Sequence, residues 1–152
     1  MADYGARGKD LRQGELITLF PAAAYVTAAA AATGTAVYLG GERRRFIFIL
    51  DVTAAASAVG DTLDVFIDWS LDGTTYYNGA HFTQVLGNGG AVAYYTVFDA
   101  TTGLAADVAV TADQAVNTTS PALFGPYVRG RYALVNGGGT HTFTFSLLGY
   151  AL

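Results

Sequence analysis

Two histidines are the side chains of this 152-residue chain best suited to acid–base chemistry near neutral pH. A nucleophilic triad needs a histidine close to a serine and a carboxylate, but His81 and His141 fall in separate predicted strands with no nucleophile or third ligand suitably spaced. The chain has no cysteine, so a disulfide framework and a structural zinc site lack their usual residues. We therefore predict a protein that is not an enzyme and needs no cofactor or metal.

Four aspartates are candidates for a catalytic pair or a calcium site: Asp51, Asp64, Asp68 and Asp72. Asp64 and Asp68 share one strand face, but four residues of strand separate them by roughly 13 Å, which exceeds the usual gap between the two acids of a glycosidase. The segment 68–73 resembles the start of a calcium loop, yet Gly79 stands at the twelfth position, where such a loop needs a bidentate carboxylate. We predict instead that these aspartates are solvated acids on sheet faces.

Glycines and aromatic residues suggest two further kinds of site. Neither glycine-rich stretch, at 87–90 or 137–139, is followed by the lysine, hydroxyl residue or helix start of a phosphate-binding loop, so both are predicted to be turns. A sugar-stacking platform would draw on Trp69, Tyr76, Tyr77, Tyr94, Tyr95 and Tyr127. Core and interface packing is the favoured interpretation of these rings, and a carbohydrate-binding module stays open as an alternative.

Short β-favouring runs separated by Gly, Asn and Asp must position these residues. Residues 45–52 contain the continuous apolar run Phe-Ile-Phe-Ile-Leu, which predicts a central strand covered on both faces. Residues 63–70 alternate between a core face and a mostly solvated face. The core face carries Leu63, Val65, Ile67 and Trp69, and the solvated face carries Asp64, Phe66, Asp68 and Ser70.

Asp72-Gly73 follows this strand and predicts a β-hairpin turn. Further strands are expected at 16–20, 36–39, 81–86, 91–98, 105–111, 127–135 and 140–148. The alanine-rich stretch at 22–32 is predicted to be a loop or a short extra strand, because Tyr25, Val26 and Thr27 disfavour a helix. The predicted fold is all-β: a single antiparallel β-sandwich, jelly-roll-like, over residues 14–152, with an extended N-terminal arm over residues 1–13.

Charged residues make up only 13% of the chain, about half the share of about 25% in soluble proteins. Such a surface predicts permanent contacts with another protein, and a monomer covered by uncharged polar side chains is the alternative. The net charge of −4 disfavours direct binding to nucleic acid. The uncharged stretch between Glu15 and Glu42 is interrupted by Pro21, threonines and glycine and lacks a basic flank, so no membrane span or signal peptide is predicted and synthesis in a host cytoplasm follows.

Six short segments carry a resemblance to a known group of proteins. They are Asp51-Val52-Thr53-Ala54-Ala55, Leu63-Asp64-Val65, Ser70-Leu71-Asp72-Gly73-Thr74, Phe82-Thr83-Gln84-Val85, Gly125-Pro126-Tyr127-Val128-Arg129 and Phe143-Thr144-Phe145-Ser146. The region from Asp51 to Leu148 resembles small virion proteins of tailed bacteriophages, particularly capsid decoration (auxiliary head) proteins. The resemblance implies a location on the capsid surface, binding to the major capsid protein, stabilisation of the capsid lattice, and a homotrimer.

The candidate contact residues of such a protein are Tyr4, Arg7, Lys9 and Arg12 in the arm, and Arg129 with Arg131 on one strand face. The arm is expected to become ordered on a neighbouring subunit. A phage tail or fibre component, which would share this composition, stays open beside the carbohydrate-binding alternative.

Overall fold

Strand-forming runs of alternating apolar residues account for most of the chain. The computed structural model describes residues 15–27, 31–40, 44–102, 109–123 and 125–152. Its strands are β1 (Glu15–Val26), β2 (Ala31–Thr33), β3 (Val37–Tyr38), β4 (Arg45–Ala54), β5 (Thr62–Ser70), β6 (Tyr77–His81), β7 (Val85–Leu86), β8 (Val92–Asp99), β9 (Thr118–Thr119), β10 (Tyr127–Val135) and β11 (Thr142–Ala151). Within this described part, no helix is long and apolar enough to cross a membrane.

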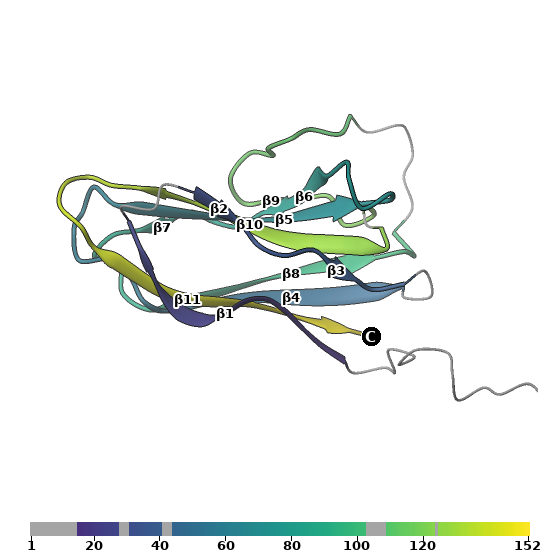
Figure 1. Cartoon of the computed structure of the whole chain (residues 1–152), viewed down its shortest axis with the longest axis horizontal. Coiled ribbons are helices and arrows are strands. Elements are labelled where there is room, and N and C mark those ends of the chain that lie inside the picture. Colours follow the sequence, from purple (N-terminus) through teal and green to yellow (C-terminus); the bar gives the residue numbers. More distant parts are fainter. Residues whose placement is uncertain (1–14, 28–30, 41–43, 103–108, 124) are drawn as a thin grey trace, which may run out of the picture.

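The strands form two sheets that lie face to face (Figure 1). The first sheet has the order β1-β11-β4-β8, and the second has the order β2-β10-β5-β6-β9, with β3 beside β10 and β7 beside β5. All of these pairs are antiparallel. Strands from distant parts of the chain are neighbours, as in jelly rolls. The predicted all-β, jelly-roll-like sandwich is confirmed, while the predicted arm at 1–13 lies outside the described residues.

The core fills the space between the two sheets. Its largest buried side chains are aromatic, and Trp69 has its ring centroid 5.2 Å from those of both Phe46 and Phe98. The inward face predicted for β5 is confirmed, because Leu63, Val65, Ile67 and Trp69 are each at most 1% exposed. Edge-to-face ring contacts of this kind contribute beyond the area they bury.

Two predicted sheet faces differ from the structure. The apolar run in β4 was expected to be covered on both faces, but this is wrong: Ile49 is 45% exposed and Ile47 is half-buried. β4 does lie inside its sheet, between β11 and β8, yet the second sheet packs against only one side of it. The outward face of β5 was expected to be solvated and is instead buried, with Asp68 2% exposed, because the segment 109–123 and two arginines cover it.

Most predicted strands are present, with their ends shifted. The strand at 127–135 is found with those bounds, and the strand expected at 16–20 continues to Val26 through register shifts around Phe20. Residues 31–33 form the short extra strand expected in the alanine-rich stretch. The run at 81–86 is divided between the end of β6 and β7. Of the strand expected at 105–111, residues 105–108 lie outside the described residues and 109–111 form no strand.

The predicted hairpin joins β5 to β6. Gly73 has a φ of 76°, a left-handed conformation that glycine adopts without steric cost. The Asp72 carboxylate accepts hydrogen bonds from the backbone N–H of Thr75 and Thr74 at 2.7 and 2.8 Å and from the Ser70 hydroxyl at 2.9 Å. These bonds lower the pKa of Asp72 below the usual range of an aspartate.

The contact between Gly149 and Phe48 provides a test of core packing. A Cβ at Gly149 would overlap the Phe48 ring, so Gly149→Ala is expected to lower the free energy of unfolding by about 1–3 kcal/mol through overpacking. Urea unfolding measures this change. Removing the ring relieves the clash, so Gly149→Ala combined with Phe48→Leu should cost less than the sum of the single variants. Additive single effects would contradict the predicted clash.

The hairpin turn predicts a pH-dependent stability. The pKa of Asp72 is lower in the folded than in the unfolded state, so its contribution is present above about pH 4, the unfolded pKa, and is lost as the pH falls through the lower folded value. Asp72→Ala should therefore be destabilising at pH 7, and the difference from the unchanged protein should shrink from pH 4 toward pH 2. Urea unfolding across this range measures it, and a constant difference would refute the prediction.

Candidate functional site

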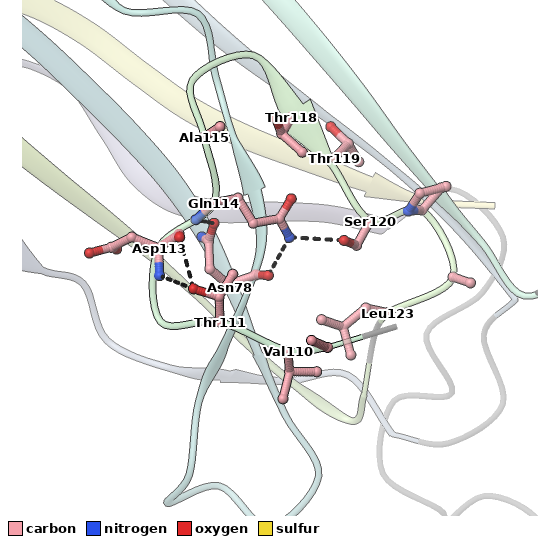
Figure 2. A pocket seen from close by; sticks show the side chains of 13 residues that line it. Asn78, Val110, Thr111, Asp113, Gln114, Ala115, Thr118, Thr119, Ser120 and Leu123 are labelled. Carbon is pink, nitrogen blue, oxygen red and sulfur yellow. Dashed lines mark hydrogen bonds between the residues drawn. The ribbon is translucent and has the colours of Figure 1, made fainter. Parts of the chain in front are cut away.

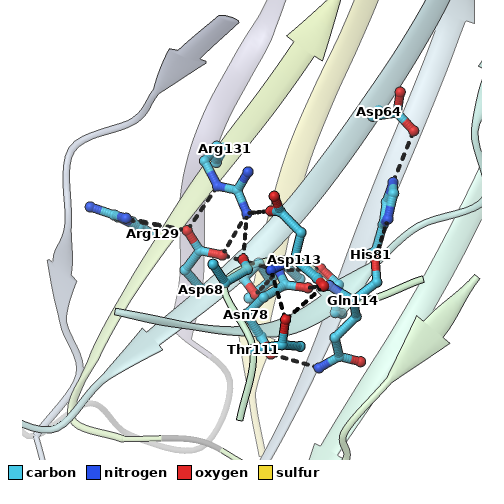
Figure 3. A network of polar contacts seen from close by, with 12 residues as sticks. Asp64, Asp68, Asn78, His81, Thr111, Asp113, Gln114, Arg129 and Arg131 are labelled. Atoms are coloured by element: carbon cyan, nitrogen blue, oxygen red, sulfur yellow. Dashed lines mark hydrogen bonds and ion pairs between the residues drawn. The ribbon is translucent and has the colours of Figure 1, made fainter. Parts of the chain in front are cut away.

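A polar network covers the outer face of the second sheet around Asp68 (Figure 3). This carboxylate accepts hydrogen bonds from Nε of Arg131 at 3.1 Å and Nε of Arg129 at 3.3 Å. Its other oxygen accepts one from the Asn78 side-chain amide at 3.0 Å. The pairing follows from strand register, since Arg129 lies directly opposite Asp68 and Arg131 comes two residues further along the same face. A buried carboxylate is tolerated here because two cations and an amide compensate its charge.

Both arginines also stack on aromatic rings. The guanidinium carbon of Arg129 lies 3.8 Å from the centre of the Tyr76 ring, and that of Arg131 lies 4.0 Å from the centre of the Phe66 ring. Burial by itself lowers the pKa of Arg131, but hydrogen bonds and charge from Asp68 and then Asp113 outweigh this effect and raise it. The prediction that Arg129 and Arg131 share one strand face is confirmed. Contact with another protein through these two side chains stays a prediction.

The network ties the segment 109–123 to the sheet. Gln114 donates from its backbone N–H to the Asn78 side-chain oxygen at 3.1 Å, and from its side-chain amide to the Asn78 carbonyl and the Ser120 hydroxyl at 2.6 and 3.0 Å. Arg131 adds bonds to the carboxylate of Asp113 at 2.6 Å and the carbonyl of residue 112 at 3.1 Å. In Figure 1 the green segment, which contains β9, arches over β6. The contacts therefore act as an anchor for this segment.

His81 belongs to the same anchor. Its Nδ1 lies 2.9 Å from the Gln114 carbonyl oxygen, and its Nε2 lies 2.9 Å from the Asp64 carboxylate. Each ring nitrogen therefore faces a protein oxygen at hydrogen-bond distance. Neither nitrogen is left to take a proton from a nucleophile. The arrangement positions a loop and does not resemble an activated catalytic triad.

His141 forms a separate pair at the end of the sandwich. Its Nδ1 lies 2.9 Å from Oδ2 of Asp61, whose side chain is fully buried. The contact is an ion pair without good hydrogen-bond alignment, since neither atom has a hydrogen-bond partner in the described part of the chain. The other Asp61 oxygen accepts a 2.7 Å bond from the Gly137 N–H. This pair joins the turn before β11 to the loop before β5.

The four aspartates have different surroundings. Asp51 and Asp72 are exposed, as predicted. Asp68 is buried, which corrects the prediction of a solvated acid, and Asp64 is half-buried because His81 and Gln84 bind it. Among the described residues, no three or more histidines and acids gather into a group that could hold a metal ion.

A pocket of about 550 Å³ opens beside the anchored segment (Figure 2). Its lining is mostly apolar, with Val110, Pro121 and Leu123 among the lining residues, and Asn78 and Gln114 supply polar groups at one side. Pockets of this size accommodate a small molecule or a side chain from a partner. Sequence reasoning missed Asn78 and Gln114, because no local pattern marks an amide side chain that binds a segment far away in the sequence.

The six candidate aromatic residues do not form one platform. Trp69 is buried in the core, Tyr76 lies beneath Arg129, and Tyr127 contacts Tyr38 with ring centroids 4.9 Å apart. Tyr95 is 72% exposed on the outer face of the first sheet. The single platform of six rings is therefore not formed, and carbohydrate binding stays an untested alternative.

A second candidate surface is the outer face of the first sheet, where no described element packs. Its exposed large apolar side chains include Leu16, Ile49, Tyr95 and Tyr150, at 62%, 45%, 72% and 41% exposure. The predicted arm contacts Tyr4, Arg7, Lys9 and Arg12 lie outside the described residues.

The anchor makes a graded prediction for two aspartates. Asp68→Ala leaves two partly buried arginines without their carboxylate and should lower the free energy of unfolding by about 2–3 kcal/mol. Asp113→Ala removes a 63% exposed partner of Arg131 and should cost no more than about 1 kcal/mol. Urea unfolding compares them, and equal losses would show that burial of Asp68 does not govern the network.

No family model matches the chain, and no curated protein is similar to it in sequence. Solved structures do match. A chain in the structure of infectious bursal disease virus Gx strain aligns with a TM-score of 0.54 and 12% identity, and one of the Gt strain aligns with 0.52 and 10%. The crystal structure of the infectious bursal disease virus VP2 subviral particle gives 0.52 and 12%. Each alignment covers 92% of this chain and 32% of the matched chain.

The likeness concerns the fold, because identities of 10–12% are low. This chain spans about one third of the length of the viral chains it matches. The chain has a β-sandwich fold found in viral capsid proteins.

Proposed function

We propose that this chain is a structural protein of a virus particle, and specifically a decoration protein that stabilises the capsid lattice of a tailed bacteriophage. The observation that carries the proposal is a sandwich fold similar to viral capsid proteins over 92% of the chain. The phage and the decorating role come from the sequence resemblance between Asp51 and Leu148. Fold alone does not fix function, so the surfaces must support the proposal too.

The polar groups of the chain support a role in binding. The histidines and aspartates that chemistry would require are engaged in holding loops: His81 with Gln114, His141 with Asp61, and Asp68 with its arginines. A large part of the first sheet meanwhile presents exposed apolar side chains with few charges. Such surfaces mark contacts between proteins. The function is then the binding energy that the chain adds to a shell.

The proposed partners are the major capsid protein and further copies of this chain. Candidate contacts to the capsid are Tyr4, Arg7, Lys9 and Arg12 in the arm, together with Arg129 and Arg131. Both described arginines retain partial exposure, 28% and 23% of their side chains, while bound to Asp68. A partner carboxylate or carbonyl can therefore reach their remaining N–H groups. The protein would be made in the host cytoplasm and would reside on the capsid surface.

Phage particles with and without this protein test the proposal. Particles lacking it should contain intact heads that release DNA at a lower temperature, and adding purified full-length protein should restore the release temperature of the complete particle. Electron microscopy of particles carrying a tagged copy should place the label on the head. Protein lacking residues 1–13 should bind these heads more weakly while its circular dichroism spectrum stays unchanged.

Other results would reject or redirect the proposal. Label confined to the tail would assign the chain to a tail or fibre, and absence from purified particles would reject a virion role. Unchanged DNA release without the protein would reject the stabilising role even if the label lies on the head. Equal binding by the shortened chain would remove the arm from the docking surface.

A further inference from the structure

The outer face of the first sheet carries two apolar rows that cross all of its strands. In the register of the sheet, Leu16, Tyr150, Ile47 and Val97 lie side by side in one row. The adjacent row contains Thr18, Leu148, Ile49 and Tyr95. All of these side chains point away from the core, since they alternate with buried neighbours along each strand.

The rows are as large as the largest apolar patch of a typical monomer, a size that often marks a functional contact. The four most exposed members alone present apolar area on the order of 500 Å², given the size of aromatic and large aliphatic side chains, and the largest patch of a typical monomer is about 300–600 Å². The half-buried Ile47, Val97 and Leu148 connect them. With its polar margin, the face approaches the roughly 800 Å² per partner of a stable interface.

Two opposite charges flank the apolar rows on β4. Arg45 and Asp51 share the outer face, each three residues from Phe48. The Arg45 side chain is 56% exposed and lies 3.5 Å from Asp99. Asp51 is exposed and has no ion pair with any residue that the structure describes. The face therefore has a cation at one end, an unpaired carboxylate at the other, and apolar residues between them.

We propose that this face binds a second copy of the same chain, with a twofold axis that crosses the strands at Phe48. Rotation about this axis stacks the two sheets face to face and reverses their strand direction. Ile47 then packs on Ile49 of the partner subunit. In the same way, the whole row that contains Ile47 in one copy packs on the row that contains Ile49 in the other copy. Arg45 comes opposite Asp51 of the partner subunit, and the same pair forms again on the other side of the axis.

The geometry of packed sheets allows these contacts. Arg45 and Asp51 lie about 10 Å on either side of the axis, since each strand residue rises about 3.3 Å. Aligned sheets cross at about 30°, which displaces the charged ends sideways by on the order of 5 Å. The long, exposed arginine side chain spans this offset. Both charged pairs remain at the edge of the contact, where their desolvation costs little.

The symmetry of the charges favours a second copy over other occupants. In a twofold contact, Arg45 and Asp51 must lie at equal distances from the centre of the apolar rows in order to pair. Binding of an unrelated partner does not require equal distances. The first 14 residues of the chain contain five charged residues and few apolar ones, so they match the apolar rows poorly. The threefold association expected from the sequence would need two different complementary patches. This inference goes beyond the proposed virion role and does not depend on it.

Sedimentation equilibrium of the full-length protein over a concentration series tests the contact. A dimer of twice the 15.8 kDa chain mass is expected. Ile49→Glu should raise the dimer dissociation constant at least about a hundredfold, because it buries an unpaired charge at the centre. Val135→Glu is the matched control, because Val135 is 54% exposed on a strand of the other sheet. It should leave the dissociation constant unchanged.

A charge exchange distinguishes the predicted orientation from any other use of this face. Asp51→Arg should weaken the dimer at least about tenfold by placing it opposite Arg45 of the partner subunit. Arg45→Asp should do the same, and the double variant should recover most of the lost affinity. Circular dichroism confirms that each variant is folded.

Several results would overturn the inference. They are a monomer at all concentrations, a trimer, equal effects of the Ile49 and Val135 variants, and no recovery in the double variant. A dimer that forms only after removal of residues 1–14 would also overturn it, because the protein's own N-terminus would then occupy the face. Solution mass tests this contact, whereas particle occupancy tests the virion role, so either can fail without the other.

Discussion

A two-layer β-sandwich buries one face of each sheet against the other and leaves two outer faces that need some other cover. In this chain the inner faces meet over an aromatic core around Trp69, Phe46 and Phe98. Around Asp68, the outer face of the second sheet is covered by the chain itself, through the segment 109–123. Within the described residues nothing covers the outer face of the first sheet. The two faces have correspondingly different chemistry, one with an ordered polar network and the other with rows of apolar side chains.

A polar cover requires more exact positioning of its groups than an apolar cover would. Asp68 is nearly fully buried, so its charge is tolerated only while Arg129, Arg131 and Asn78 keep their positions. Gln114 and His81 extend the requirement to the segment above, because their bonds have fixed directions. An apolar cover could slide along the sheet, whereas this network permits one placement of the segment. The segment itself supplies nearly the whole lining of the pocket beside Val110 and Leu123, so the shape of the pocket depends on that placement.

The sequence predicted the sandwich because strand periodicity is a local property. β10 and the inward face of β5 follow directly from alternation and turn residues. The faces of the sheets were predicted less well, since their cover comes from elsewhere in the chain. Asp68 alternates like a solvated residue and is buried by arginines 61 and 63 positions away. The apolar run around Ile47 and Ile49 indicates burial on both sides, and one of those sides is open in the single chain.

That last discrepancy bears on function. The sequence of β4 has the pattern of a strand buried on both faces, but one of its faces is open in the isolated chain. The pattern and the structure agree if another subunit covers the open face. The low share of charged residues, 13% of the chain, points the same way, because the surface of a dispersed protein usually carries about 25–35% charged residues. Surface charge makes a dispersed monomer more soluble. In a shell of closely packed copies, the same charge weakens binding because the copies repel one another. In the proposed assembly, the exposed face and the sparse charge would have one common cause, because both suit a chain that is covered by other subunits.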